Sequence, residues 1–397
     1  MKIAIVGAGV VGVSLAKQLL RYDESVEIEL YDSFSVPSKG TSIRNSGVLH
    51  AGLYYAPSTL KSKLCFEGRT ALEEYITENS LPLLRCGKLL VPHTEGDKKR
   101  LYAIKKKADA NGCETYLVDY DFAKKIQPGI CKRNIYLWSP KTGVFSPKTI
   151  LDQIVADLVK TRRVTFIRAE VTYIDPCTTS IKSSISSKRK YDYIYNVAGP
   201  GALDLFKKIS DLLDDIKLIP FIGEYARLKV GPDIKTNIYP VPDPNLPFLG
   251  VHVTPRADED EPIIGPNALP FQRSYLDEYI ASDITDLTSR LALLSAMFMG
   301  NKENFRDHAV SEFALNKRKK FLTETKRFFD DKSKEEVKIK LDDSVYGIRP
   351  QLVDIKNLNF VNDFVLEKTN NIIHVVNAVS PAFTSALSLG DYLCKMI

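Results

Sequence analysis

Cysteine is scarce in this sequence, and the cysteines that are present are scattered. The 397-residue chain has six of them, and no two form a C-x-x-C pair: Cys65, Cys86, Cys113, Cys131, Cys177 and Cys394. Metal clusters and small disulfide-bonded folds depend on regular cysteine spacing. We therefore expect no metal site, no disulfide framework, and reduced thiols in a cytosol-like compartment.

Long apolar runs and a strong excess of one charge are also missing. No run reaches the roughly 20 apolar residues of a membrane-spanning helix. The first predicted strand begins at residue 2, which leaves no space for a signal or transit peptide, so we expect a cytoplasmic protein. The 55 Lys and Arg residues against 49 Asp and Glu give a net charge of +6. This mild excess suits an anionic cofactor, acidic substrates or an anionic membrane surface, and by itself it does not indicate nucleic acid binding.

The opening 32 residues hold the pattern around which the chain is organised. An apolar run over residues 2–6 predicts a buried strand, and the glycines of a G-x-G-x-x-G motif follow it: Gly7, Gly9 and Gly12. Gly7 permits a tight turn, Gly9 lets a pyrophosphate approach the backbone, and Gly12 lets the next helix pack closely. Apolar residues at helical spacing and a second strand over 26–31 then lead to Asp32. This order of elements predicts a dinucleotide site.

Asp32 narrows the choice of dinucleotide. Its carboxylate can accept hydrogen bonds from the adenosine ribose hydroxyls, and its charge would repel the additional phosphate of NADP. The free N–H groups and the positive dipole end of the preceding helix would bind the pyrophosphate. The motif is compatible with both NAD and FAD.

Later segments carry patterns that relate to this opening unit. Gly40–Tyr55 is rich in glycine and interrupted by polar side chains, which is typical of a loop that wraps a ligand. Ser146-Pro147 predicts the capped start of a helix. Tyr191–Gly199 predicts a strand that returns to the nucleotide sheet. Residues 371–378 predict a last strand, followed by a capped helix that Ser380-Pro381 opens.

The middle of the chain has a different composition. Residues 219–267 are rich in proline and aromatic side chains, and they predict an antiparallel sheet that serves as a substrate domain. Residues 274–340 are charged and predicted to be helical, with an apolar patch over 291–299 close to a basic stretch over 316–321. This region is interpreted either as a solvated helical cover on the sheet or as a peripheral membrane contact.

These patterns together resemble the FAD-dependent family that includes D-amino-acid oxidase, glycine oxidase and glycerol-3-phosphate dehydrogenase. Features of that family are the opening fingerprint, the Ala198-Gly199 turn and the segment Gly347–Pro350. Within it the chain is similar to the L-2-hydroxyglutarate dehydrogenases or oxidases, over the following segments: Asn45–Tyr55, Leu60–Cys65, Cys86–Val91, Pro220–Tyr225, Ile238–Asp243, Pro247–Arg256, Gly265–Asn267 and Asn377–Ser385. The sequence departs from that subfamily at Asp32, where Glu is usual, and at Arg44, where His is typical.

The resemblance implies an α/β fold of the glutathione reductase and D-amino-acid oxidase type. Its discontinuous Rossmann-like FAD-binding domain would comprise residues 1–85, 145–215 and 341–397. An antiparallel-sheet substrate domain with a helical cover would comprise 86–144 and 216–340. A division into domains also fits a chain too long for one compact core.

The resemblance also implies the chemistry: L-2-hydroxyglutarate, a dicarboxylate, is oxidised to 2-oxoglutarate by hydride transfer to flavin N5 of bound FAD. The expected electron acceptor is a quinone or oxygen, with a peripheral membrane contact. Two alternatives stay open. The flavin could act on another 2-hydroxy acid or an amino acid, or the chain could be an FAD-binding scaffold without turnover.

His50 is the candidate catalytic residue, because a neutral imidazole can take the hydroxyl proton as the hydride leaves. Arg256 and Arg349 are candidate clamps for the two substrate carboxylates, since a guanidinium binds a carboxylate through two parallel hydrogen bonds. The other candidate substrate contacts, for which packing in the sheet is the alternative, are His252, Tyr225 and Tyr54.

The expected cofactor contacts come from both ends of the chain: Gly7, Gly9, Gly12, Asp32, Ser42, Asn45, Ser46, Val171, Ala198, Gly199, Gly347, Ser380 and Thr384. Among them Ser380 has a specific expected role. As the cap of a C-terminal helix, it would direct a positive helix end toward the negative charge of the reduced flavin.

Overall fold

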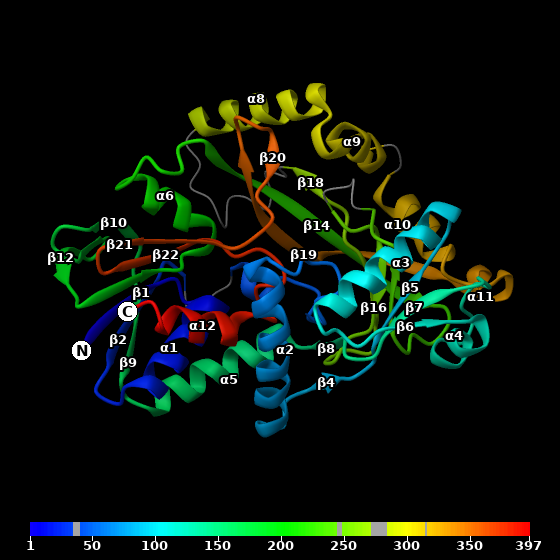
Figure 1. Ribbon diagram of the computed structural model, residues 1–397, viewed down its shortest axis with the longest axis horizontal. Coiled ribbons are helices and arrows are strands. Elements are labelled where there is room, and N and C mark those ends of the chain that lie inside the picture. Colours follow the sequence, from blue (N-terminus) through cyan, green and yellow to red (C-terminus); the bar gives the residue numbers. More distant parts are fainter. Residues whose placement is uncertain (35–39, 244–247, 271–283, 314–315) are drawn as a thin grey trace.

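The computed structural model of the chain describes residues 1–34, 40–243, 248–270, 284–313 and 316–397 (Figure 1). The expected helical region from Ser274 therefore lies partly outside the described residues. None of the helices in the described part of the chain has the length and apolar character needed to cross a bilayer.

A six-stranded sheet carries both ends of the chain, in the order β21-β22-β13-β1-β2-β9. Its strands are β1 (Lys2–Val6), β2 (Glu27–Asp32), β9 (Val164–Arg168), β13 (Tyr193–Asn196), β21 (Val365–Thr369) and β22 (Ile372–Asn377). All neighbours pair in parallel except the edge strand β21. The prediction that the Tyr191–Gly199 strand returns to the nucleotide sheet is confirmed, because β13 pairs with β1.

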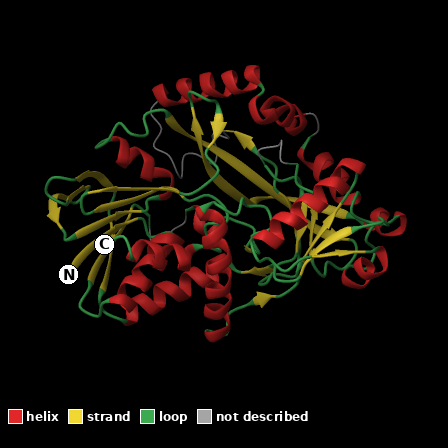
Figure 2. Cartoon of the chain, viewed as in Figure 1, coloured by secondary structure: helices red, strands yellow, loops and turns green. Residues whose placement is uncertain are grey.

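The two faces of this sheet are covered differently, since successive side chains of a strand point to opposite sides. Ile3 and Ile5 of β1 pack with residues of four helices: α1 (Val10–Tyr22), α2 (Leu60–Glu78), α5 (Pro147–Lys160) and α12 (Ala386–Cys394). These helices lie together on one side of the sheet (Figure 2). Ala4 and Val6 pack on the other face, against α6 (Ala202–Lys207) and a three-stranded sheet of β10 (Val171–Asp175), β11 (Ser180–Ser183) and β12 (Ser186–Lys190).

Local capping sets the start of α5. The side chain of Ser146 accepts a hydrogen bond from the backbone N–H of Thr149, and Pro147 occupies the first helical position. Proline is suited to this position because the missing N–H would have no partner inside the helix. The predicted helix start at Ser146-Pro147 is therefore confirmed.

A ten-stranded sheet forms the other half of the molecule. Its strands are β5 (Lys88–Val91), β6 (Tyr116–Val118), β7 (Tyr136–Ser139), β14 (Ile216–Val230), β15 (Asn237–Pro240), β16 (His252–Thr254), β17 (Ile263–Gly265), β18 (Leu269–Pro270), β19 (Lys338–Asp354) and β20 (Asn359–Phe360). Pairing is antiparallel as expected for residues 219–267, except that β15 lies parallel to β5. The long pair β14–β19 lies in this sheet and sets Phe221 opposite Arg349. The domain boundaries stay a prediction. Most of β19 belongs to this sheet but falls in the range 341–397, which was expected to form part of the FAD-binding domain.

Helices cover this sheet from several sides (Figure 1): α3 (Glu95–Ala110), α4 (Tyr120–Ile126), α8 (Ile284–Gly300), α9 (Phe305–Phe313), α10 (Lys317–Lys326) and α11 (Asp331–Glu336). Leu293 and Met297 of α8 are buried against Ile219 and Phe221 of β14. A small sheet of β3 (Val48–Leu49), β8 (Gly143–Phe145) and β4 (Leu83–Leu84) completes the described strands. Helices therefore lie over this sheet where the chain is described, and the choice between a solvated cover and a membrane contact stays a prediction.

Candidate active site

A cavity of about 730 Å³ is lined by both large sheets. Its wall combines the β1–α1 turn, the end of β2, the loop after residue 40, the turn after β13, parts of β14 to β16 and β19, and the turn after β22. This volume is in the usual range for a small-molecule or cofactor site. The segments that meet here come from the beginning, middle and end of the chain.

The β1–α1 turn has the close packing that the glycine motif predicts. Gly7 adopts φ +111°, a conformation that L side chains rarely adopt, and a Cβ on it would lie 2.4 Å from the carbonyl oxygen of Val197. A Cβ on Gly12 would lie 1.9 Å from the carbonyl oxygen of Gly7. Gly9 lines the cavity, and a Cβ there would narrow the space beside Ser42 Oγ, 3.0 Å away. The N-terminus of α1 therefore opens on a narrow cradle that fits a dinucleotide phosphate.

Asp32 ends β2 at the cavity wall. Its carboxylate oxygens accept hydrogen bonds from the backbone N–H groups of Ala8, at 2.8 Å, and Phe34, at 2.9 Å. Burial raises the pKa of the Asp32 carboxyl, and the two N–H groups act in the opposite direction. The acid is thus fixed beside the glycine turn, where the ribose contact was expected.

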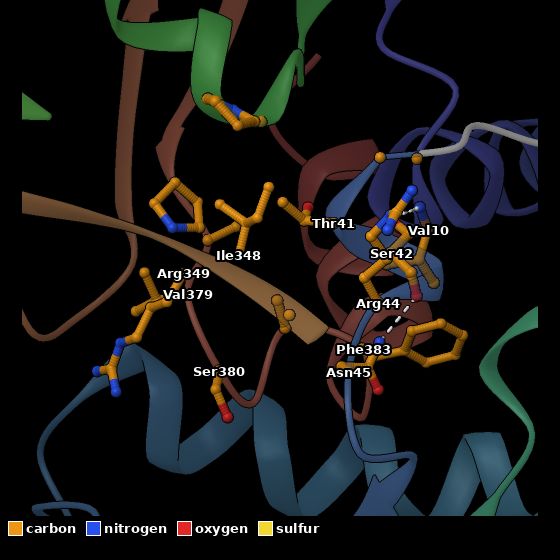
Figure 3. A pocket seen from close by; sticks show the side chains of 18 of the residues that line it. Val10, Thr41, Ser42, Arg44, Asn45, Ile348, Arg349, Val379, Ser380 and Phe383 are labelled. Carbon is orange, nitrogen blue, oxygen red and sulfur yellow. Dashed lines mark hydrogen bonds between the residues drawn. The ribbon is translucent and has the colours of Figure 1, made fainter. Parts of the chain in front are cut away.

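The loop after residue 40 is shaped by its own polar side chains. Ser42 Oγ accepts a hydrogen bond from the backbone N–H of Val10 at 2.9 Å, which joins the loop to the first turn of α1 (Figure 3). Asn45 Nδ2 donates to the carbonyl oxygen of Ser42 at 2.8 Å, and Asn45 Oδ1 accepts from the N–H of Gly47 at 3.0 Å. Ser46 also lines the cavity, and its side chain hydrogen-bonds Tyr225. The expected contacts Ser42, Asn45 and Ser46 are therefore all at the cavity.

Distant segments close the cavity from other sides. Val171, Ala198 and Gly199 line it, and a Cβ on Gly199 would meet no atom within 4 Å. Gly347 of β19 passes so close to the loop that a Cβ there would lie 2.7 Å from the carbonyl oxygen of Arg44. In Figure 3, Arg349 and Ser380 lie on one side, with Ser42, Arg44 and Asn45 opposite. The open space at Gly199, the narrow cradle at Gly9 and the fixed acid fit the chemistry of FAD.

The predicted helix at Ser380 is wrong. Ser380 lies in a turn at the cavity wall, and α12 begins only at Ala386, with Ser385 as its N-cap. The backbone forms turns before the helix begins: Ala382 N–H donates to the carbonyl oxygen of Val379 at 3.1 Å and Ala386 N–H to that of Phe383 at 3.2 Å. The turn lines the cavity, and Thr384 Oγ1 joins it to the segment around β3.

His50 follows β3 and faces the cavity. Its backbone N–H donates a hydrogen bond to Thr384 Oγ1 at 3.1 Å, and Thr384 Oγ1 donates to the carbonyl oxygen of Val48 at 3.3 Å. Burial lowers the pKa of His50 well below its usual value, and the positive charges of Lys88 and Lys61 lower it further. The imidazole is therefore neutral at physiological pH and able to accept a proton.

Arg349 lies on β19 and also lines the cavity. Its Nε donates to Gln351 Oε1 at 3.0 Å, and its guanidinium lies 5.0 Å from the ring centre of Phe248. Burial lowers the pKa of Arg349 to about 10, so that it stays charged at neutral pH. The two Nη groups make no ion pair with an acid in the described part of the chain, which suits a bound carboxylate.

His252 and Tyr225 also reach the cavity. His252 Nδ1 donates to the carbonyl oxygen of Gly250 at 2.9 Å, and the ring stacks on Tyr239 with centres 3.8 Å apart. Burial lowers the pKa of His252 to about 3, so that this ring is neutral. Burial raises the pKa of Tyr225 to about 12, which keeps its hydroxyl protonated as a hydrogen-bond donor.

Two predicted substrate residues are not among those that line the cavity. Arg256 Nη2 pairs with Asp258 at 3.1 Å and with Glu259 at 3.3 Å. The hydroxyl of Tyr54 is buried and makes no hydrogen bond within the described part of the chain. The structure therefore brings His50, Arg349, His252 and Tyr225 together but directs Arg256 toward acidic neighbours.

Sequence reasoning missed two buried lysines near His50. Lys88 is 1% exposed and Lys61 is 7% exposed. A lysine at the start of an apolar strand, as in Lys88–Val91, was the available indication, since charged side chains are almost never fully buried without a reason. Among the described residues, no three His, Cys, Asp or Glu side chains gather in a way that could hold a metal ion.

Comparison with known proteins gives consistent matches over the chain. A family model described as "DAO: FAD dependent oxidoreductase" matches residues 2–396. A relative from Caenorhabditis briggsae, named "L-2-hydroxyglutarate dehydrogenase, mitochondrial", is 33% identical over 98% of this chain and 92% of its own length. A relative of the same name from Homo sapiens is 30% identical over 100% of this chain and 88% of its own length.

Solved structures share the fold. L-alpha-glycerophosphate oxidase from Mycoplasma pneumoniae, with FAD bound, has a TM-score of 0.73 and 18% identity over 98% of this chain and 92% of that one. Glycine oxidase from Geobacillus kaustophilus has a TM-score of 0.69 and 14% identity over 99% of this chain and 93% of that one. The expected fold class is therefore confirmed.

Proposed function

The chain belongs to the family of FAD-dependent oxidoreductases, and on that premise we propose that it oxidises L-2-hydroxyglutarate to 2-oxoglutarate. FAD as the cofactor follows from the family. The substrate is supported by relatives of that name over nearly the full length of the chain. The observation that carries the proposal is a neutral His50 and a charged Arg349 on the wall of one cavity.

Bound FAD supplies the acceptor for the hydride that leaves the substrate carbon. In the proposed reaction, His50 takes the proton from the substrate hydroxyl. A neutral imidazole can accept this proton, and the proton transfer is effective when the base is held within hydrogen-bond reach of the hydroxyl. Arg349 binds the carboxylate next to the reacting carbon, and the protonated Tyr225 hydroxyl donates a further hydrogen bond.

We assign the predicted cofactor contacts by their place on this wall. Gly7, Gly9 and Gly12 admit the pyrophosphate at the N-terminus of α1, and Asp32 accepts hydrogen bonds from the ribose. The remaining contacts hold the adenine and flavin ends: Ser42, Asn45, Ser46, Val171, Ala198, Gly199, Gly347, Ser380 and Thr384. All of them except Gly12 line the cavity.

Anaerobic reduction of the bound flavin tests the substrate. We expect the purified protein to be yellow and its flavin absorbance to bleach on addition of L-2-hydroxyglutarate. The D-isomer, other 2-hydroxy acids and amino acids serve as comparisons. Bleaching by an amino acid but not by L-2-hydroxyglutarate would assign the enzyme to another substrate. A colourless protein that does not take up added FAD would indicate a scaffold without turnover.

The electrons then pass to a quinone or oxygen, and a peripheral membrane contact would favour the quinone. Apolar side chains are exposed on the outer helices: Leu291 is 51%, Met299 74% and Phe313 69% exposed. Arg318 and Lys319 at the start of α10 add exposed positive charge nearby in sequence. Apolar and basic groups of this kind suit an anionic bilayer surface.

Liposome flotation tests this contact directly. We expect the protein to float with vesicles that contain anionic lipid and to stay behind with neutral vesicles. Met299→Asp should weaken flotation because it adds a charge to the apolar face. Equal turnover with oxygen and with a soluble quinone, without any flotation, would contradict a membrane-linked acceptor.

A further inference from the structure

Lys88 is an ionisable side chain that the fold buries almost completely. It lies at the start of β5 and is 1% exposed. Its ammonium lies 4.1 Å from the ring centre of Tyr239 and 5.4 Å from that of Tyr54, so two aromatic faces stabilise the positive charge. Burial lowers the pKa of Lys88 to about 7.

This ammonium makes no ion pair with an acid in the described part of the chain, and the neighbouring Tyr54 hydroxyl makes no hydrogen bond there. Burial of an unpaired charge and an unpaired hydroxyl is costly. Such groups persist where a ligand satisfies them, and perturbed ionisable groups are frequent at functional sites. Lys88 and Tyr54 therefore offer a donor pair to an anion.

The position of Lys88 connects it to the cavity. The Tyr239 ring that contacts its ammonium stacks on His252, and both rings line the cavity. The charge of Lys88 also lowers the pKa of His50, second only to the effect of burial. Lys88 is not itself among the residues that line the cavity: it lies behind the lining ring of Tyr239, on the side that β15 and β16 form, and its charge reaches the proposed base.

A second positive group lies near Arg349. Lys61, in the first turn of α2, is 7% exposed, and its ammonium lies 5.5 Å from the ring centre of Tyr55. Burial and then the charge of Arg349 lower the pKa of Lys61 to about 8. The charges of Lys61 and Lys88 both act on His50. His50 thus has Lys61 and Lys88 within electrostatic reach, and Lys61 in turn lies near Arg349.

We propose that Lys88 binds the distal carboxylate of the dicarboxylate substrate, while Arg349 and Lys61 hold the carboxylate next to the reacting carbon. This inference rests on the proposed function. It assigns the binding of the distal carboxylate to Lys88 instead of Arg256, because Arg256 already pairs with Asp258 and Glu259. The buried ammonium and the Tyr54 hydroxyl would bind the distal carboxylate and fix the substrate's orientation at His50.

Substrate preference is the decisive measurement. L-2-hydroxyvalerate has the same carbon chain as L-2-hydroxyglutarate but ends in a methyl group, so it lacks the distal carboxylate. In Lys88→Met we expect kcat/KM for the dicarboxylate to fall roughly 30-fold or more, because a buried charge pair is lost. For L-2-hydroxyvalerate it should stay within about twofold, because Lys88 does not contact the part that the two acids share.

The matched control is Lys99→Met, which removes an exposed lysine from α3. It should leave kcat/KM for both substrates unchanged. An equal loss for both substrates in Lys88→Met would mean that Lys88 only supports His50 or the fold, and would overturn the inference. Loss of preference in Arg256→Met but not in Lys88→Met would also overturn it.

A pH profile of the unmodified holoenzyme tests the same point without a variant. Lys88 is charged below its pKa, so kcat/KM for the dicarboxylate should fall above about pH 7, and kcat/KM for L-2-hydroxyvalerate should not show this fall. Identical profiles for both substrates would contradict the inference. If the unmodified protein oxidises neither acid, the proposed function itself fails, which is a different outcome.

Discussion

The backbone N–H of His50 donates a hydrogen bond to Oγ1 of Thr384, 3.1 Å away and 334 positions later in the chain. The same hydroxyl donates to the carbonyl oxygen of Val48, so one side chain holds both ends of the short segment that carries the proposed base. Thr384 is 1% exposed, which leaves no water to replace these bonds. The C-terminal turn thereby sets the position of a residue near the start of the chain.

Thr384→Val should displace His50 without disturbing the core, because valine has almost the same shape but lacks the hydroxyl. We expect unfolding free energy to fall by about 1–3 kcal/mol, since buried groups lose their partners. Turnover should fall as well, in the fraction of the protein that retains FAD. Thr384→Ser keeps the hydroxyl and is the control. Chemical denaturation and flavin reduction rates measure both effects, and unchanged turnover in the valine variant would show that His50 does not depend on this bond.

His50→Gln should retain FAD and lose most turnover, by roughly 10²- to 10⁴-fold, because glutamine cannot take the hydroxyl proton. The rate of anaerobic flavin bleaching measures this step. The matched variant is His93→Gln, at a histidine that packs against Phe328 and is not among the residues lining the cavity. A bleaching rate near that of the unmodified protein in His50→Gln would contradict the role of general base.

Gly12→Ala and Gly9→Ala should separate folding from cofactor binding. A Cβ on Gly12 would lie 1.9 Å from backbone oxygen, so α1 must shift, and we expect a loss of about 1–3 kcal/mol in stability. A Cβ on Gly9 has only the Ser42 hydroxyl 3.0 Å away, and it should mainly weaken FAD affinity.

FAD titration and thermal unfolding distinguish the two glycine variants. Gly96→Ala is the control, because its nearest neighbour would be 3.6 Å away and alanine favours a helix. Normal FAD affinity in Gly9→Ala would contradict the assignment of the pyrophosphate to this turn.

Lys88→Met should make the protein more stable while it loses activity on the dicarboxylate. The pKa of Lys88 is about 7 in the folded chain and about 10.4 in an unfolded one. Between these values the unfolded chain binds more protons, so this group destabilises the fold fully below pH 7 and progressively less up to about pH 10. The free energy of unfolding of the variant should therefore exceed that of the unmodified protein by on the order of a few kcal/mol at pH 6, and this difference should shrink as the pH rises.

Urea unfolding of both proteins at pH 6 and at higher pH measures this difference. A variant that is less stable at pH 6 would mean that Lys88 makes a stabilising contact in the folded protein. It would then be a structural residue, and its burial would need no ligand to explain it.

The local parts of the fold follow from the sequence because their causes lie within a few residues. The β1–α1–β2 unit is fixed by the apolar run of β1, by apolar residues at helical spacing in α1, by glycines whose Cβ atoms would clash, and by Asp32 at the end of β2. The start of α5 follows from Ser146 and Pro147 for the same reason. The resemblance to a flavin-dependent family also rests on short segments that can be recognised in the sequence.

The helix expected at Ser380 shows where local reasoning fails. Serine followed by proline is a good helix start in isolation, yet the structure forms a turn there, and Thr384 in the same segment bonds the chain around His50. A contact between positions so far apart leaves no local pattern. Sequence alone therefore could not place the start of α12 relative to the cavity.

The type of protein can be inferred from the sequence: a nucleotide-binding unit, a second sheet, and a set of residues typical of flavin-dependent oxidation. Which cations are buried near His50 follows from the fold, because the rings that enclose Lys88 come from distant parts of the chain. Arg256 is followed by acids two and three positions later in the sequence, whereas Lys88 opens an apolar strand. In the fold, acids next to Arg256 neutralise it, whereas two aromatic rings enclose Lys88 beside His50.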